Sequence, residues 1–239
     1  MTRTAPHVAS SKAACPFANV DLALGIDDPT DYVVACPFHS HAAAPIASIT
    51  TPVDLVVRNS TFITTDTSAS LLRDIGGGDK IRECCTRFYA HAFLDSQLKP
   101  FFFEDDGATA HGHRLANWII EKMGGEGKPW TDSGRLGMRQ RSHSKAWNCV
   151  KRHESVRGDH FNLVDARTWM RIHFWAAREC RLHRHEAFWR WYIRFLQHFI
   201  AVYERRAVPY ANDDANWSKK QSNLDAYIQS NHTMLDLHG

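Results

Sequence analysis

The feature that most constrains the fold is the spacing of apolar residues between residues 79 and 93. They recur every three to four positions, the period at which side chains share one face of an α-helix. The apolar positions are Ile81, Cys84, Cys85, Phe88, Tyr89, Ala92 and Phe93. Asp79 stands where a helix cap is expected, and three glycines from residue 76 end a shorter apolar face before it. The pattern predicts successive helices over 68–75 and 79–93.

A third helix is predicted over residues 108–123. His111, Leu115 and Trp118 lie at positions i, i+4 and i+7, so their side chains share one helix face. The pair Gly124-Gly125 follows at once and is typical of a helix end.

The apolar period is lost over residues 126–159, which are polar and basic and predict at most short helical turns. It returns over 164–181 and 185–203, which predict two long helices. The last helix carries apolar residues beyond its main stripe: Trp189, Trp191 and Ile200. This surplus indicates contact with the terminal segments or with a partner chain, so an oligomer formed through the last helix is a possibility. No sheet is required, and the sequence predicts an all-α fold.

Composition divides the chain into three parts. Residues 1–66 are rich in Ala, Ser, Thr and Pro and predict an irregular N-terminal extension, with an alternating run over 53–57 that is typical of a strand. Residues 67–206 form the helical domain. Residues 207–239 predict a polar C-terminal tail with one turn near 224–228.

Charge and cysteine usage exclude several classes of protein. The formal net charge of +3 is too small and too evenly spread to indicate nucleic-acid binding. No apolar run approaches the roughly 18 residues that a membrane span needs, and the N-terminus lacks the apolar core of a signal peptide. We therefore expect a cytoplasmic protein whose six cysteines are free thiols. Two of them, Cys15 and Cys36, occur in a repeated Ala-Cys-Pro-Phe motif.

Eight Trp and thirteen Phe favour either a large aromatic core or a pocket for a flat apolar ligand. Between residues 68 and 204 short motifs occur in a fixed order: Leu71-Leu72-x-x-Ile75-Gly76-Gly77, Arg87-Phe88-Tyr89-Ala90, Phe101-Phe102-Phe103-Glu104-Asp105-Asp106, Gly124-Gly125, Trp130-Thr131, Arg139-x-Arg141-x-His143 and Trp169. In this order they resemble the group II truncated haemoglobins. The resemblance implies a globin-like two-over-two helical sandwich.

The resemblance also implies a cofactor, haem b (iron protoporphyrin), held by a proximal histidine. The basic run that ends at His143 resembles the family's run before that histidine, although Ser142 intervenes here. The segment between His143 and Trp169 is longer than in the family and includes His153 and His160. His143 is the first choice for the iron ligand, and His153 and His160 remain alternatives.

On the distal side, the resemblance places Tyr89 and Trp169 around the iron-bound ligand. His111 lies one helical turn before Leu115 and is expected to face the same space. The three side chains would donate hydrogen bonds to bound dioxygen. Around the porphyrin, the expected packing residues are Phe102, Leu115 and Trp118. The expected partners of the propionates are Arg139, Arg141 and Lys145.

The expected function is reversible binding of dioxygen, and of nitric oxide and carbon monoxide, with slow release. Slow release suits ligand capture, sensing or redox chemistry such as nitric oxide dioxygenation or peroxide reduction. The chain has no flavin or nicotinamide fingerprint, so turnover would need an external reductase.

Two other classes of function compete with this one. His-x-His occurs at residues 39/41, 111/113 and 183/185, which would suit a zinc or di-metal enzyme. The sequence shows no carboxylate or cysteine at matched spacing around 111/113, which argues against that enzyme. A non-haem sensor or interaction protein with a globin-like fold is the other alternative.

Overall fold

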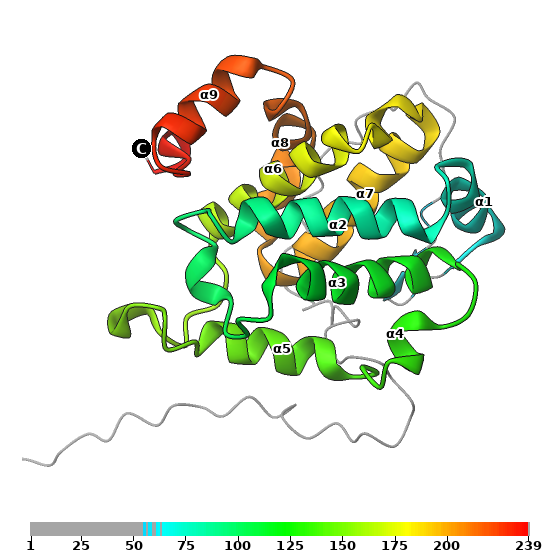
Figure 1. Ribbon diagram of the computed structural model, residues 1–239, viewed down its shortest axis with the longest axis horizontal. Coiled ribbons are helices and arrows are strands. Elements are labelled where there is room, and N and C mark those ends of the chain that lie inside the picture. Colours follow the sequence, from blue (N-terminus) through cyan, green and yellow to red (C-terminus); the bar gives the residue numbers. More distant parts are fainter. Residues whose placement is uncertain (1–54, 56, 59–60, 63, 239) are drawn as a thin grey trace, which may run out of the picture.

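A computed structural model describes residue 55 and residues 57–58, 61–62 and 64–238 (Figure 1). This part of the chain is all-α, which confirms the predicted fold class. Outside the helices and turns it holds one short hairpin, in which β1 (Val57–Arg58) pairs antiparallel with β2 (Thr61–Phe62).

Most of the predicted N-terminal extension lies outside the described residues. This holds for both Cys-Pro pairs, at Cys15 and Cys36, and for the His-x-His motif at 39/41. Of the alternating run over 53–57, only Leu55 and Val57 are described, and Val57 begins β1.

The described chain contains α1 (Asp66–Asp74), α2 (Gly78–Ala92), α3 (Gly107–Met123), α4 (Pro129–Asp132), α5 (Met138–Trp147), α6 (Leu163–Glu179), α7 (Glu186–Tyr203), α8 (Ala211–Trp217) and α9 (Gln221–Gln229). Short 3-10 turns connect them: η3 (Lys99–Phe101), η4 (Glu154–Val156), η5 (Leu182–Arg184), η6 (Arg205–Tyr210) and η7 (Leu235–Leu237). None of the helices described here has the length and apolar character needed to cross a membrane.

Five helices, α1, α2, α3, α6 and α7, coincide with those predicted from apolar spacing. The prediction of at most short turns over 126–159 is wrong, because α5 is a helix of 10 residues. Its buried face consists of Arg139, Ala146 and Trp147. A buried arginine and two adjacent residues near the end of the helix leave no apolar period in the sequence.

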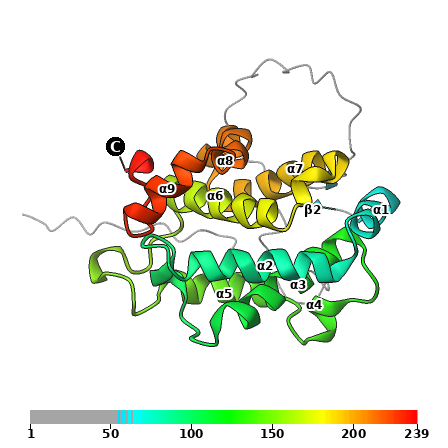
Figure 2. The ribbon, with the colours of Figure 1, turned by 45° about the horizontal axis from the view of Figure 1, so that its top comes forward.

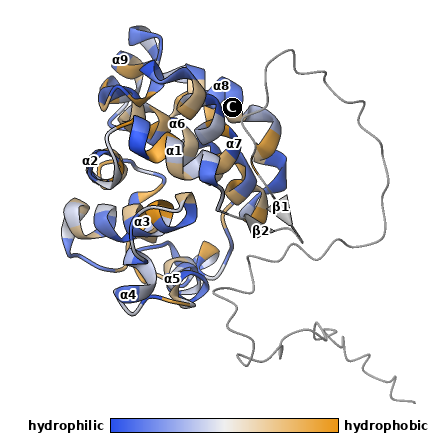
Figure 3. Ribbon diagram, turned by 90° about the vertical axis from the view of Figure 1, so that its right-hand side faces the viewer, coloured by the Kyte–Doolittle hydropathy of each residue, from blue (hydrophilic) through white to orange (hydrophobic). Residues whose placement is uncertain are grey.

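The helices form two layers, with α2, α3 and α5 in one and α6 and α7 in the other (Figure 2). Within the first layer, α2 packs along α3, and α2 also contacts α6 of the second layer. Hydrophobic and hydrophilic residues alternate within single helices in Figure 3, as expected for helices with one buried face. The main core joins both layers through large, completely buried residues, among them Ile81, Ile119, Met170, Tyr192 and Phe195.

The close approach of α2 and α3 depends on one glycine. A Cβ atom at Gly112 would lie 2.6 Å from Cα and 2.7 Å from the backbone nitrogen of Thr86. These distances are shorter than van der Waals contact, and the atoms in the way belong to the backbone of α2. Gly112 therefore sets the separation of the two helices.

The C-terminal segment differs from the expected polar tail, because residues 207–238 contain α8 and α9 and dock on the domain. Asp214 of α8 is fully buried and accepts hydrogen bonds from Arg167 and Arg171 of α6, each through N···O distances near 2.9 Å. Tyr227 of α9 donates to the buried carboxylate of Asp95 at 2.9 Å. Buried hydrogen bonds and ion pairs hold this segment on the domain. Because these contacts use polar side chains, the sequence of the segment shows little apolar residue spacing.

The apolar surplus of α7 is covered within the chain. Trp191 is completely buried and stacks on Phe195 at 4.8 Å between ring centroids, and Ile200 is 8% exposed. Trp189 packs edge-on against Phe174, at 5.4 Å between centroids. The feature that indicated a partner chain is therefore explained by intramolecular packing.

We predict that Gly112→Ala destabilises the protein by about 2 kcal/mol, because overpacking costs about 1–3 kcal/mol and the better helix propensity of Ala returns less than 1 kcal/mol. The measurement is the free energy of unfolding in denaturant. Thr109→Ala, on the exposed side of α3, is the control and should change that free energy by less than about 0.5 kcal/mol. Equal stabilities of Gly112→Ala and wild type would contradict the proposed role of the glycine.

Candidate functional site

A cavity lies among the helices, and α2 to α7 all contribute to its walls. It encloses about 1070 Å³ of space free of protein atoms, part of which is open to solvent. Most of its lining is aromatic or aliphatic, including Trp118, Ile119, Trp130, Leu196 and Phe199. Protein interiors are normally packed without such voids. A cavity with this lining is therefore the candidate binding site for a mainly apolar ligand.

His143 of α5 lines this cavity. Its ring packs edge-on against Tyr203 at 4.7 Å and Phe161 at 5.7 Å between centroids. Its Nδ1 atom is buried and has no hydrogen-bond partner among the described residues. Burial, and secondarily the charge of Arg139, lower the pKa of His143 from 6.5 to about 3. The imidazole is therefore neutral at physiological pH, the state in which histidine binds a metal.

The two alternative histidines lie elsewhere. His153 is exposed, and its Nδ1 lies 2.7 Å from the hydroxyl of Ser155 at the start of η4. His160 is exposed and stacks on the outer face of the α5 residue Trp147, at 3.9 Å between centroids. Neither lines the cavity, so among the three candidates the structure brings only His143 to it.

Tyr89 of α2 and Trp169 of α6 also line the cavity. The ring of Phe88 lies between them, 4.8 Å from that of Tyr89 and 5.2 Å from that of Trp169. Burial raises the pKa of Tyr89 well above its ordinary value, so its phenol stays protonated and can act as a hydrogen-bond donor. Leu115 adds an apolar side chain to the same wall.

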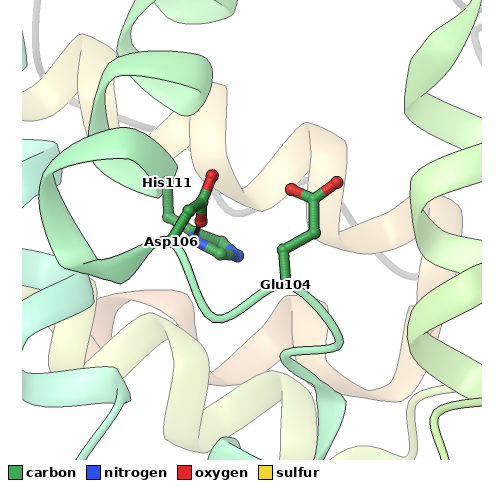
Figure 4. Close-up of side chains that lie close together, drawn as sticks. All are labelled: Glu104, Asp106 and His111. Carbon is green, nitrogen blue, oxygen red and sulfur yellow. Dashed lines mark ion pairs between the residues drawn. The ribbon is translucent and has the colours of Figure 1, made fainter.

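His111 does not line the cavity, although it was expected to face the bound ligand. Its ring packs against Tyr89 and Phe93, each 5.1 Å away between centroids. Its Nδ1 lies 2.8 Å from a carboxylate oxygen of Asp106 and 3.2 Å from the carbonyl oxygen of Gly107 (Figure 4). A proton on Nδ1 serves both acceptors, so neutral His111 keeps a lone pair on Nε2 and cannot donate a hydrogen bond through it.

Phe102 likewise stands behind the cavity wall. Its ring contacts Tyr89 at 5.6 Å and His111 at 5.7 Å between centroids, and it is absent from the lining. Phe102 and His111 thus support the ring of Tyr89 from behind and do not contact the enclosed space.

The structure corrects the expectation that no carboxylate accompanies His111, because Glu104 and Asp106 lie beside it (Figure 4). Ligand atoms of these three residues lie within 4.8 Å of one another. Arg114, however, pairs with both acids, at 2.9 Å from Glu104 and 2.5 Å from Asp106, and lowers the pKa of Asp106. The guanidinium of Arg114 already neutralises both carboxylates. The cluster is therefore an ion-pair network, and it does not favour a metal-dependent enzyme.

The three basic residues expected at the propionates separate in the structure. Arg139 lines the cavity, and its guanidinium lies 4.7 Å from the ring of Trp118. Lys145 lines a smaller neighbouring cavity together with Arg135, and Ser142 lies in the walls of both cavities. Arg141 is exposed on α5 and lines neither.

Several residues of the cavity wall were not predicted from the sequence. Tyr203 lies four residues after Phe199, and its helical spacing was a usable signal. Phe161 and Asp165 had no such signal, because they come from the loop before α6 and from its first turn. The carboxylate of Asp165 accepts hydrogen bonds from Gln97 at 2.6 Å and from its own helix cap, so it is fully engaged inside the protein.

The buried imidazoles of His143 and His173 predict a pH dependence of stability. Burial lowers both pKa values to about 3, from 6.5 in the unfolded chain. Below pH 6.5 the unfolded state therefore binds protons that the folded state does not. The free energy of unfolding should fall by about 1.4 kcal/mol per pH unit for each group as the pH decreases toward 3, and should not change from this source above 6.5.

Denaturant unfolding of the apoprotein at several pH values in this window measures the slope. His143→Gln should reduce it by about 1.4 kcal/mol per pH unit. The exposed His153→Gln, whose ring meets water in both states, is the control. An unchanged slope in His143→Gln would show that this imidazole is accessible to protons in the folded protein.

Comparison with known proteins found no family model, no curated protein and no solved structure that matches the chain. What the cavity binds must therefore be inferred from the residues that form it.

Proposed function

We propose that the cavity binds haem b and that His143 is the proximal ligand of its iron. We propose that the protein is a two-over-two globin, similar to the group II truncated haemoglobins, and that it binds dioxygen reversibly. One observation carries the proposal: the neutral imidazole of His143, whose buried Nδ1 has no hydrogen-bond partner among the described residues, lines an aromatic cavity between two helical layers. An unpaired buried polar group costs about 1–3 kcal/mol, and coordination of a metal accounts for its presence.

The lining fits a porphyrin. Aromatic and aliphatic side chains, including Leu115, Trp118 and Trp130, provide broad apolar contact for a flat macrocycle. Iron in a globin needs one imidazole on one face and an open position on the other. His143 supplies the first, and neither His153 nor His160 reaches the cavity to close the second.

Tyr89 and Trp169 are the proposed donors to the bound gas. Bound dioxygen carries partial negative charge on its outer oxygen, so a phenol or indole N–H that reaches it stabilises the bound state. Each such hydrogen bond contributes about 1–3 kcal/mol in a pocket that excludes water. His111 is no longer proposed as a donor to the bound gas. Its ring is held by Asp106 and packs against Tyr89, so it supports the position of the Tyr89 ring.

The cationic groups suit the two propionates. Arg139 stands in the wall of the main cavity, while Arg135 and Lys145 line the neighbouring one, and Ser142 lines both. We therefore assign propionate binding to Arg139, Arg135 and Lys145, and no longer to the exposed Arg141.

Slow gas release favours capture, sensing or chemistry on the bound ligand over bulk transport. Dioxygenation of nitric oxide and reduction of peroxide are the two reactions that haem would supply here. Both need electrons, and the sequence has no nucleotide-binding fingerprint of its own, so an external reductase is the proposed partner.

The proximal assignment is tested by reconstitution with haem. Wild-type protein should show a Soret band and a five- or six-coordinate haem spectrum. His143→Ala should lose tight haem binding, and free imidazole added to the variant should restore the spectrum, because the small base replaces the missing ligand. His153→Ala and His160→Ala are matched controls and should keep the wild-type spectrum. Loss of haem in either control but not in His143→Ala would refute the assignment.

The distal assignment is tested by the rate of dioxygen release, measured by stopped-flow mixing of the oxygenated protein with carbon monoxide. Tyr89→Phe should raise the dissociation rate by about ten- to a hundredfold, corresponding to a hydrogen bond of about 1–3 kcal/mol. Tyr227→Phe makes the same chemical change at a buried tyrosine outside the cavity and should leave the rate unchanged. Equal rates in Tyr89→Phe and wild type would remove Tyr89 from the ligand site.

A further inference from the structure

Three aromatic side chains lead from the cavity wall into the core. Trp169 lines the cavity and stacks on His173, one turn later in α6, with ring centroids 4.6 Å apart and planes inclined by 25°. The Nε2 atom of His173 lies 2.6 Å from the hydroxyl oxygen of Tyr192 in α7. His173 and Tyr192 are completely buried. The chain of contacts is continuous and closed to water beyond Trp169.

The direction of the hydrogen bond follows from the surroundings. Nδ1 of His173 is buried and has no partner among the residues that the structure describes. If Tyr192 donates to Nε2, only the Nδ1–H group remains unpaired. If Nε2 donates instead, the phenolic hydrogen and the Nδ1 lone pair both remain unpaired, which costs more. Tyr192 is therefore the donor, and His173 presents a basic lone pair to the phenolic proton.

A tyrosine bonded in this way gives up an electron more easily than an isolated one. Oxidation makes a phenol strongly acidic, so the electron can leave only if a nearby base accepts the proton. The other polar groups around Tyr192 are the thiols of Cys84, Cys85 and Cys180. The hydrogen bond with Cys180, together with burial, raises the pKa of Cys84, and burial raises that of Cys85, so both thiols stay protonated. His173 is the base placed for this proton.

We propose that Trp169, His173 and Tyr192 form a relay that supplies one electron from Tyr192 to the cavity during reduction of hydrogen peroxide. The proposal rests on the haem site proposed above. Trp169 is the contact between the relay and the cofactor, and Tyr192 is the electron donor. His173 is a positioning residue that also accepts the proton.

Reduction of hydrogen peroxide takes up two electrons as its oxygen–oxygen bond breaks, and the bound haem would supply one of them and Tyr192 the other. One oxygen leaves as water with the two peroxide protons, and the phenolic proton of Tyr192 moves to Nε2 of His173. The external reductant then returns one electron to the iron and one to Tyr192. The second oxygen leaves as water with two protons from solvent, while the proton on His173 returns to Tyr192.

The test is electron paramagnetic resonance of the ferric, haem-loaded full chain, frozen after mixing with hydrogen peroxide. Wild type should give a tyrosyl radical signal that narrows when tyrosine is ring-deuterated. Tyr192→Phe should lose this signal while keeping its Soret band. Tyr227→Phe removes the hydroxyl of another buried tyrosine, hydrogen-bonded to Asp95 at 2.9 Å, and should keep the signal.

His173→Gln separates proton transfer from packing, because the glutamine amide accepts a hydrogen bond but does not take up a proton. It should bind haem and unfold like wild type, yet lose the radical signal. An unchanged signal in Tyr192→Phe or His173→Gln overturns the relay, and so does a wild-type signal insensitive to tyrosine deuteration. If Tyr192→Phe does not fold, the relay is decided by the radical signal of His173→Gln and by the effect of tyrosine deuteration on the wild-type signal. A wild-type protein without a Soret band overturns the haem site itself, whereas a haem-loaded protein without the tyrosyl signal overturns only the relay.

Discussion

Burial of the aromatic side chains around a central cavity is the constraint on which the rest of this structure depends. Close packing elsewhere compensates for the contacts that a cavity forfeits. Six helices contribute residues to the cavity walls. The aromatic rings in these walls are held by edge-to-face contacts, such as those of Phe88 with Tyr89 and with Trp169. The same burial keeps His143 neutral and Tyr89 protonated. One physical cause thus sets both the shape of the site and the protonation of its groups.

The elements outside the cavity hold its walls in place. Gly112 lets α3 approach α2 closely enough for Tyr89 and Leu115, on different helices, to share one wall. On the far side, α8 binds α6 through the buried carboxylate of Asp214. A buried ion pair of this kind adds little net stability, yet loss of one partner leaves a charge stranded in the core. Docking of α8 therefore fixes the position of α6, which carries Trp169 and His173.

The structure also separates residues that resemble each other in the sequence. His143, His153 and His160 lie in the same basic region, but only the first is shielded from solvent at the cavity, while the others cap a turn or stack on Trp147 from outside. His111 shares a helix face with Leu115, yet hydrogen bonding to Asp106 and Gly107 keeps it behind Tyr89. Chemical type alone does not distinguish a ligand from a support, because the difference lies in what surrounds each ring.

The sequence by itself determined the long helices α2, α3, α6 and α7, because apolar residues at helical spacing report burial through local geometry alone. The expectation that Tyr89, Leu115, Trp118 and Trp169 surround a ligand came from the resemblance to the truncated haemoglobins, and all four side chains line the cavity. Tertiary structure alone decided what depends on contacts between distant residues. It brought His143, but neither His153 nor His160, to the cavity wall, formed α5 around a buried arginine, and docked α8 through ion pairs between residues more than 40 positions apart. Polar anchors and loop residues leave no periodic trace in a sequence, since their partners are brought to them only when the chain folds.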